Sequence, residues 1–504
     1  MSRSKPLGLL LAASLLLTAC GLTQPAPEAL PAEEEATVDP TEPPEEPLES
    51  TLVWTPCEEP FECSTLPVPR DYGQPDGPTV TLALIRLPAP AAARRIGSLV
   101  VNPGGPGGSG VDFVRQAGVE TFPAELRARF DIVGFDPRGV AASEGIACDQ
   151  EAVARFAGTL TSGVADVLAA AQRFAAGCAA HGGELLPHVA TPNVAADLDL
   201  LREALGDRRL TYLGYSYGTL IGAMYAERYP DKVRAIVLDG AVDPAQDVVA
   251  RARDKAAATE VALQDFLQWC RDEECSMSAV GEPSMVWAAV LAALQRGSVP
   301  APLLGAGRSM NRGEAMFTTS ALLADRADGW PLLAEALAMV AGDHDASLLL
   351  GMFDALSGRD AEAEELSGFE FGQLMAVNCL DLPAPPAEEY PRLLAEMEGV
   401  SPLFGAVTLL SWAPCSYWPV PPVRQAAPIH APGSPPLVVI GTRNDGVTPY
   451  AWSEALAGQL DNAVLFTRDG DTHTAFGGAN VCTDRAIMGY LLEEQPPEAG
   501  KSCG

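Results

Sequence analysis

Residues 210–218 read LTYLGYSYG, and this stretch decides how the rest of the chain is interpreted. Its first four residues are an apolar run typical of a buried strand, and residues 219–229 continue as a helical run. The glycines on either side of Ser216 leave room for a sharp turn that exposes a hydroxyl at the edge of a sheet. The following helix points its amino end at the same place, which favours a developing negative charge. This context predicts that Ser216 is a nucleophile and not a structural serine in a turn.

Short apolar runs rich in β-branched residues recur before and after this stretch, separated by segments long enough for helices. They lie at residues 80–85, 98–102, 130–135, 210–213, 233–238, 436–440 and 463–466. Because apolar residues fill these runs and do not alternate with polar ones, they indicate a parallel sheet that is covered on both faces. The sequence therefore predicts the α/β class, with a mostly parallel, doubly wound sheet.

The strand pattern stops between residues 244 and 424. This interval is rich in Ala, Leu, Glu and Asp and is predicted to be mostly helical, after which strands resume. An insertion at this point would lie over the carboxyl edge of the sheet and shape a substrate pocket. We therefore expect a core made of residues 51–243 and 425–504, with residues 244–424 as a helical lid.

A serine hydroxyl needs a base, and the chain contains five histidines: His181, His188, His344, His430 and His473. For a serine on such a turn, the partners follow in the order nucleophile, acid, histidine. Only His473 follows the last expected strand, in the sequence DGDTHT of residues 469–474. The other four are expected at the surface or in packing, although His344, in the lid, could contact substrate. His473 is therefore the predicted base.

The acid of such a triad should follow the preceding strand. Asp445 stands there, in the sequence GTRNDGVTP of residues 441–449, with a glycine beside it that permits a turn. Asp243 competes because it lies near the end of an earlier strand. Asp469 and Asp471 are so close to His473 in sequence that they are expected to shape the histidine loop or to face solvent. We favour Asp445, whose carboxylate would hold the imidazole tautomer and stabilise the imidazolium.

An oxyanion hole is the remaining requirement. The backbone N–H of Tyr217 should supply one donor, and Gly105, in the sequence GGPGG of residues 104–108, should supply the second. Glycines let the backbone approach a tetrahedral oxygen closely. The loop lacks the lysine of a phosphate-binding loop and the spacing of a dinucleotide site. No cofactor is therefore expected at this loop, and no metal is expected elsewhere because the cysteine spacings are not those of zinc ligands.

Four motifs in order resemble a known family: NPGGPGGSG at 102–110, GFDPRG at 134–139, GYSYGT at 214–219 and DGVTP at 445–449. Together they resemble secreted bacterial tripeptidyl aminopeptidases, relatives of proline iminopeptidase within the α/β hydrolases. The resemblance runs from about Trp54 to Cys503 and departs at Pro103, where iminopeptidases usually have histidine. It implies an α/β-hydrolase fold, release of short peptides from a free amino terminus, and pairing of most cysteines.

An enzyme that acts at free amino termini must bind an ammonium group, and a buried carboxylate does this best. Asp381 is a candidate because a disulfide between Cys379 and Cys415 would hold its loop. Asp239 and Asp243 are others because both follow a core strand. A solvated carboxylate is the alternative for each of the three.

The first 50 residues are expected to be a lipoprotein signal peptide followed by a tether. Residues 1–20 have a basic start, a short apolar stretch and the ending LTAC, which resembles a bacterial lipobox with Cys20 as the lipidated residue. The apolar stretch is too short for a comfortable transmembrane helix. Residues 21–50 are rich in Pro and Glu, which is typical of an extended tether. The chain is therefore expected to be exported and lipid-anchored at the bacterial envelope.

The remaining ten cysteines are an even number, as expected in an oxidising compartment. Three pairs are close enough in sequence to suggest local bridges. The four cysteines that are left, Cys148, Cys178, Cys379 and Cys415, would form two more. Their spacings are not those of zinc ligands. The local pairs are Cys57–Cys63, Cys270–Cys275 and Cys482–Cys503. Cys148–Cys178 with Cys379–Cys415 is one arrangement of the other four, and the sequence leaves the connectivity open.

The formal net charge of −33 repels phosphate backbones, so nucleic acid is not an expected partner, whereas cationic partners are favoured. Peptides with a free amino terminus are the expected substrates. An esterase or lipase could use the same triad, although the lid is more acidic than a lipase lid. A binding lipoprotein with a defunct site is the third hypothesis, and the intact set of Ser216, Asp445 and His473 argues against it.

Overall fold

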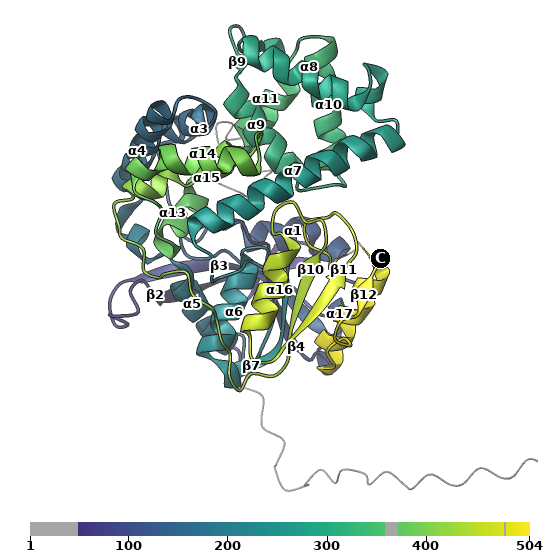
Figure 1. The fold of residues 1–504 in the computed structure, drawn as a ribbon. Helices are drawn as coiled ribbons and strands as arrows, with labels where there is room; N and C mark the ends of the chain where they lie inside the picture. Colours follow the sequence, from purple (N-terminus) through teal and green to yellow (C-terminus); the bar gives the residue numbers. More distant parts are fainter. Residues whose placement is uncertain (1–48, 358–370, 478–479) are drawn as a thin grey trace, which may run out of the picture. The chain divides into compact units, whose positions relative to one another are not determined.

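A ten-stranded sheet runs through the part of the chain that the computed structural model describes, residues 49–357, 371–477 and 480–504 (Figure 1). Its order is β1-β2-β3-β5-β4-β6-β7-β10-β11-β12, and every neighbouring pair from β5 to β12 is parallel. The predicted α/β class and mostly parallel sheet are therefore confirmed. The strands are β1 Thr55–Glu58, β2 Phe61–Pro69, β3 Thr79–Leu87, β4 Gly97–Asn102, β5 Phe130–Phe135, β6 Leu210–Tyr215, β7 Val233–Asp239, β10 Leu437–Thr442, β11 Ala463–Arg468 and β12 Ser502–Cys503.

The seven apolar runs found in the sequence all fall in strands, to within one residue. Strand β4 shows why they are apolar throughout. Leu99 and Val101 join the core on one face of the sheet, and Val100 joins the core on the other face. Because both faces are covered, a central strand has no solvent side on which polar residues could alternate.

The antiparallel edge of the sheet is not evident from the sequence. Strands β1 and β2 pair with each other in antiparallel fashion, β2 pairs with β3 in the same way, and β3 is antiparallel to β5. The residues of β1 are exposed and those of β2 are largely half-buried, with prolines and glutamates among them. Such edge strands lack the apolar run by which the central strands are recognised.

Helices cover both faces of the sheet. Residues of α5, α6 and α16 join the core on one face, and residues of α1, α2 and α17 join the core on the other face. The turn that carries Ser216 lies between β6 and α6, at the end of a strand that is buried at every position. The bounds of these helices are α1 Gly110–Thr121, α2 Ala124–Arg127, α5 Thr191–Ala204, α6 Gly218–Arg228, α16 Tyr450–Gln459 and α17 Val481–Glu493.

The described residues between β7 and β10 are mainly helical, and we refer to α7–α15 as the helical insertion. A two-stranded hairpin of β8 (Val299–Pro300) and β9 (Ser309–Met310) interrupts it. Figure 1 shows α7 running across the end of the sheet, with the other helices of the insertion beyond it. These helices are α7 Val248–Asp272, α8 Pro283–Arg296, α9 Arg312–Leu322, α10 Gly329–Gly342, α11 Ser347–Leu356, α13 Phe371–Asp381, α14 Tyr390–Val400 and α15 Gly405–Leu410.

Two helices from between β5 and β6 join the insertion. They are α3 (Gln150–Thr159) and α4 (Val164–His181). The ring of Phe156 on α3 stacks on Phe371 of α13 with 6.5 Å between centroids, and the ring of Phe174 on α4 lies 5.8 Å from the same ring. The strand pattern places α3 and α4 within the core segment because they lie between two core strands in sequence.

The motif GFDPRG of residues 134–139 stabilises the fold. Arg138 and Asp197 form an ion pair whose side chains are both fully buried, with 2.7 Å from Nε to Oδ2. The guanidinium also donates to the carbonyl oxygens of Pro69 and Arg70 at 2.8 Å. Because every charge in the pair has partners, it ties the end of β2 to α5 without leaving an unpaired buried ion.

The expected disulfides are all present. The five bridges join Cys57–Cys63, Cys148–Cys178, Cys270–Cys275, Cys379–Cys415 and Cys482–Cys503. The predicted leader at residues 1–20, its Cys20 and the tether as far as residue 48 lie outside the described residues. Among the described helices, none has the length and apolar character needed to cross a bilayer. The bridges indicate an extracytoplasmic protein.

Candidate active site

Ser216 stands on a strained turn between β6 and α6. Its φ is +54°, a left-handed conformation that a serine rarely adopts. The flanking glycines make the turn sterically feasible, because a Cβ on Gly214 would lie 2.3 Å from the carbonyl oxygen of Gly218. The N–H of Ser216 donates to the carbonyl oxygen of Asp239 at 2.8 Å, which fixes the turn against the end of β7.

His473 and Asp445 are hydrogen-bonded to one another. The Nδ1 atom of His473 lies 2.9 Å from Oδ2 and 3.1 Å from Oδ1 of Asp445. The carboxylate is buried at the end of β10, and 19% of the imidazole remains exposed in the loop after β11. A proton on Nδ1 directed at the carboxylate leaves Nε2 free to accept another. The arrangement is that of a general base held by an acid.

The serine and the imidazole meet the same short segment after β7. The turn of Ser216 is bonded to Asp239, and a Cβ on Gly240, the next residue, would lie 3.3 Å from Cε1 of His473. Strands β6, β7 and β10 are parallel neighbours, so the loops that follow them emerge at one edge. The structure thus brings the three residues proposed from the sequence to one place.

The competing acids are engaged elsewhere. One oxygen of Asp243 accepts from the N–H of Ala245 and the side chain of Gln459. Asp469 pairs with Arg443 at the surface, and Asp471 pairs with Arg326. None of these carboxylates is hydrogen-bonded to an imidazole in the described part of the chain, whereas Asp445 is.

Thr448 was not singled out from the sequence, although it lies in the motif that contains Asp445. Its Oγ1 donates to Oδ2 of Asp445 at 2.8 Å, and its N–H donates to Oδ1 at 2.9 Å. The N–H of Val447 donates to the same Oδ1 at 2.8 Å. These bonds fix the orientation of the carboxylate that the imidazole meets, so Thr448 is a positioning residue.

Asp239 is a sequence candidate for substrate binding, but its carboxylate faces the histidine loop. It is fully buried and accepts the N–H of Phe476 at 2.8 Å and that of Ala475 at 3.0 Å. Burial raises the pKa of Asp239 to about 7, against the lowering effect of these two bonds. The sequence offers no sign of this role, since 236 residues separate Asp239 from Ala475.

The glycine loop lies directly against the turn that carries Ser216. Gly104 has φ +95°, and a Cβ there would lie 2.5 Å from the carbonyl oxygen of Tyr215 and 3.1 Å from the N of Tyr217. Gly105, Ser216 and Tyr217 line one pocket. The N–H groups of Gly105 and Tyr217 have no acceptor among the described residues, so both can serve an oxyanion.

The pH dependence of activity should report the pKa of His473. Burial lowers this pKa, but the charge and hydrogen bond of Asp445 outweigh burial and raise it above the usual 6.5. Because the base must be neutral, kcat/KM should fall as pH drops through a midpoint above 6.5. The charge of Asp239 also raises the pKa of His473. Asp239→Asn should therefore move this midpoint to lower pH.

The measurement is a pH profile of kcat/KM from about pH 5 to about pH 9 for the wild type and Asp239→Asn. Asp469→Asn serves as the control because its carboxylate is paired at the surface. Equal midpoints for wild type and Asp239→Asn would contradict the assigned electrostatic contact.

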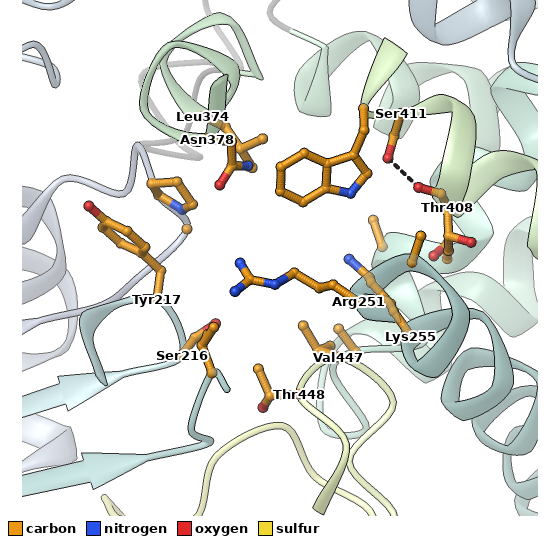
Figure 2. A pocket seen from close by; sticks show the side chains of 18 of the residues that line it. Ser216, Tyr217, Arg251, Lys255, Leu374, Asn378, Thr408, Ser411, Val447 and Thr448 are labelled. Atoms are coloured by element: carbon orange, nitrogen blue, oxygen red, sulfur yellow. Dashed lines mark hydrogen bonds between the residues drawn. The ribbon is translucent and has the colours of Figure 1, made fainter. Parts of the chain in front are cut away.

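A pocket of about 300 Å³ opens beside Ser216. Its floor comes from the loops after β4, β6 and β10, and its walls come from α7, α9, α13 and α15 of the helical insertion. Figure 2 shows Ser216 and Thr448 on the side of the sheet, with Leu374, Asn378 and Ser411 on the side of the insertion. Ser216 thus faces a space that the insertion limits.

The three carboxylates considered for an ammonium group are placed differently. Asp381 lines the pocket, at the end of α13 and not in a loop, whereas Asp239 and Asp243 do not line it. One oxygen of Asp381 accepts the N–H of Thr191 at 2.9 Å, and the other accepts its hydroxyl. That hydroxyl lies 2.6 Å from the hydroxyl of Tyr217. Burial raises the pKa of Asp381 above its usual value, and the bonds to Thr191 and the nearby arginines offset this rise only in part.

Two family models match the chain. One, described as alpha/beta hydrolase fold, matches residues 97–282, and the other, described as TAP-like protein, matches residues 401–503. The serine protease Hip1 of Mycobacterium tuberculosis is 35% identical over 487 residues, covering 90% of this chain and 91% of that protein. A tripeptidyl aminopeptidase of Streptomyces lividans is 32% identical, covering 88% and 84%. A protein named carboxylesterase B, also from M. tuberculosis, is 34% identical, covering 88% and 86%.

Proposed function

The chain belongs to the TAP-like family of α/β hydrolases and is an enzyme that acts on peptides, and from this premise we propose that it releases short peptides, chiefly tripeptides, from free amino termini. The proposed catalytic residues are Ser216, Asp445 and His473. The observation that carries the proposal is the hydrogen-bonded Asp445–His473 pair beside a serine that opens into a pocket limited by the insertion.

The proposed chemistry proceeds through an acyl-enzyme. Oγ of Ser216 attacks the scissile carbonyl carbon while Nε2 of His473 takes its proton, and the N–H groups of Gly105 and Tyr217 bind the oxyanion. The imidazolium then protonates the leaving amine, and the C–N bond breaks. Water then attacks the ester carbonyl while His473 takes its proton, and the imidazolium returns that proton to Oγ of Ser216 as the acyl C–O bond breaks. The bond from Ser216 to His473 is not formed among the described residues, and such bonds often close only with substrate.

The pocket supports release of a short fragment. The walls contributed by α9, α13 and α15 close it on the side away from the sheet, and its volume of about 300 Å³ is small for a site that takes peptide. A substrate segment that entered this pocket from Ser216 would meet these helices. The position of the walls therefore favours cleavage near a chain end over cleavage in the middle of a protein.

Asp381 is the proposed contact for the substrate ammonium. It is the carboxylate among the described pocket-lining residues, and it is 3% exposed. A carboxylate can accept about four hydrogen bonds, and Thr191 supplies two of them. Acceptor positions therefore remain for an ammonium group, whose charge would suit the carboxylate.

We also propose that the protein is exported and held at the envelope by lipid on Cys20. The five disulfides support an oxidising compartment, and the sequence LTAC ending at residue 20 supports lipidation. Cys20→Ser should move the protein from the detergent phase to the aqueous phase on detergent phase partition. Continued partition of this variant into detergent would contradict the anchor.

The peptidase proposal is tested with chromogenic tripeptide anilides that carry free or acylated amino termini, beside short-chain nitrophenyl esters. Free tripeptides should be cleaved, and blocked ones should be cleaved at least about tenfold more slowly, since they lack the ammonium. Asp381→Asn should reduce this preference. Faster cleavage of blocked peptides would contradict action at amino termini.

Esterase action is the second candidate, favoured by the relative named carboxylesterase B and by the apolar side chains that share the pocket. The same triad would serve it. Efficient hydrolysis of esters with no cleavage of free or blocked tripeptides would favour this function, with the site unchanged.

A further inference from the structure

Two cationic side chains extend into the pocket from α7. Arg251 and Lys255 are four residues apart on this helix, so they lie on the same side of it. Both line the pocket together with Ser216. Figure 2 shows both side chains extending from α7 toward the centre of the pocket, with the guanidinium on the side of Ser216 and Tyr217. Neither residue has a role in the proposed triad or oxyanion hole.

Neither cation forms an ion pair within 4.0 Å in the described part of the chain. Arg251 donates from Nη2 to the carbonyl oxygen of Asp243 at 3.1 Å, and its buried Nε has no hydrogen-bond partner among the described residues. Burial lowers the pKa of Arg251 to about 10 and also lowers the pKa of Lys255. A desolvated cation without a close counter-charge is costly, so the site is suited to an added anion.

The neighbouring carboxylates are hydrogen-bonded to other groups, and in the described part of the chain none of them lies within ion-pair distance of Arg251 or Lys255. Asp445, whose charge acts on Lys255, is bonded to His473 and to its own loop. Asp381 accepts two bonds from Thr191, and its charge raises the pKa of Arg251 without an ion pair between them. Its remaining acceptor positions are those proposed for the substrate ammonium. The described pocket lining therefore holds two cations against one carboxylate, in a chain whose formal net charge is −33.

We propose that Arg251 and Lys255 bind a carboxylate of the substrate, so that the enzyme selects acidic peptides. The guanidinium offers an unused N–H, and the ammonium offers up to three donors, which together match the two oxygens of a carboxylate. This inference rests on the proposed peptidase function. The carboxylate can be the side chain of an acidic residue next to the scissile bond or the free carboxyl terminus of a short peptide.

The first experiment compares kcat/KM for paired substrates on the wild-type protein. Ala-Ala-Glu and Ala-Ala-Gln p-nitroanilides differ in one charge at nearly constant shape, and Ala pentapeptides with free or amidated carboxyl ends test the other source. A preference of about 10- to 100-fold for the charged member is expected in one pair. Preference in the first pair identifies a side chain, and preference in the second pair identifies the terminus. Equal rates in both pairs would overturn the proposal.

The second experiment repeats the preferred pair with Arg251→Gln and Lys255→Met. Each substitution should lower the ratio of kcat/KM for the charged substrate to kcat/KM for the neutral one by about tenfold, toward one. Arg253→Gln is the matched control, because Arg253 lies on the same helix but is exposed, and its ratio should equal that of the wild type. Circular dichroism checks that each variant is folded. An unchanged ratio in both pocket variants would overturn the proposal.

Ester substrates distinguish failure of the peptidase proposal from failure of the carboxylate-site proposal. If no peptide is cleaved, p-nitrophenyl hemiglutarate is compared with p-nitrophenyl butyrate. Preference for the hemiglutarate, lost in Arg251→Gln, would support the carboxylate site in an esterase. Absence of that preference would overturn the carboxylate site, whatever the enzyme cleaves.

Discussion

Ser216→Ala is expected to lower kcat by about 10⁵-fold or more, which is the largest effect expected of any single substitution in this chain. Without Oγ no acyl-enzyme forms, and only binding and the oxyanion hole remain to accelerate attack by water. The pocket and KM should change little, since only one oxygen is removed. The measurement is steady-state hydrolysis of the best chromogenic substrate, with a fluorophosphonate probe to detect labelling of the serine.

The control for this variant is a measurement that it is folded. The substituted alanine must adopt the same left-handed turn, φ +54° at Ser216 in the native chain, so thermal unfolding is measured alongside activity. Labelling by the probe should disappear in the variant. Retention of a substantial part of the activity in a folded variant would exclude Ser216 as the nucleophile and would end the proposed mechanism.

Asp445→Asn is expected to lower kcat by about 10⁴-fold. The asparagine amide can keep the shape of the site, but its NH₂ would face Nδ1 of His473 and favour the tautomer that carries the proton on Nε2. That tautomer cannot accept the proton of Ser216. The loss should therefore appear in kcat, with KM nearly unchanged and with the acid limb of the pH profile moved to lower pH.

The competing acids supply the controls for this substitution. Asp243→Asn and Asp469→Asn remove carboxylates that contact Gln459 and Arg443, not the imidazole. Both should retain kcat within about threefold of the wild type, because such partners lie outside the reacting atoms. A loss in Asp243→Asn that matches the loss in Asp445→Asn would show that the acid was wrongly assigned.

Local sequence signals were sufficient for the parts of the site that are local. Ser216 is recognisable because strand, glycines and helix are contiguous, and Gly105 is recognisable because its loop follows a strand directly. His473 follows from chain order in a protein with few histidines. In contrast, the sequence favours Asp445 over Asp243 only by its position after a strand and the glycine beside it, and the hydrogen bond to the imidazole distinguishes the two.

The contacts that the sequence did not predict join residues across long separations. Asp239 holds a loop 236 residues away, and Thr191 meets Asp381 over 190 residues. In the sequence of α7, Arg251 and Lys255 resemble the charged residues of an ordinary solvent-exposed helix face. Nothing in that sequence shows that these two side chains line a pocket. Their significance depends on what lies opposite them in the pocket.

The sequence by itself determined the α/β sheet and the turn at Ser216, because strand burial and glycine geometry are properties of neighbouring residues, and it suggested the three local cysteine pairs by their short separations. Tertiary structure alone decided that α3 and α4 join the insertion, and that Asp381 borders the pocket while Asp239 and Asp243 do not. It alone placed two cations, without ion-pair partners among the described residues, in the pocket beside Ser216. The burial of a side chain and the compensation of its charge depend on all residues that surround it in space. Most of these residues are distant in sequence, so the local sequence does not reveal them.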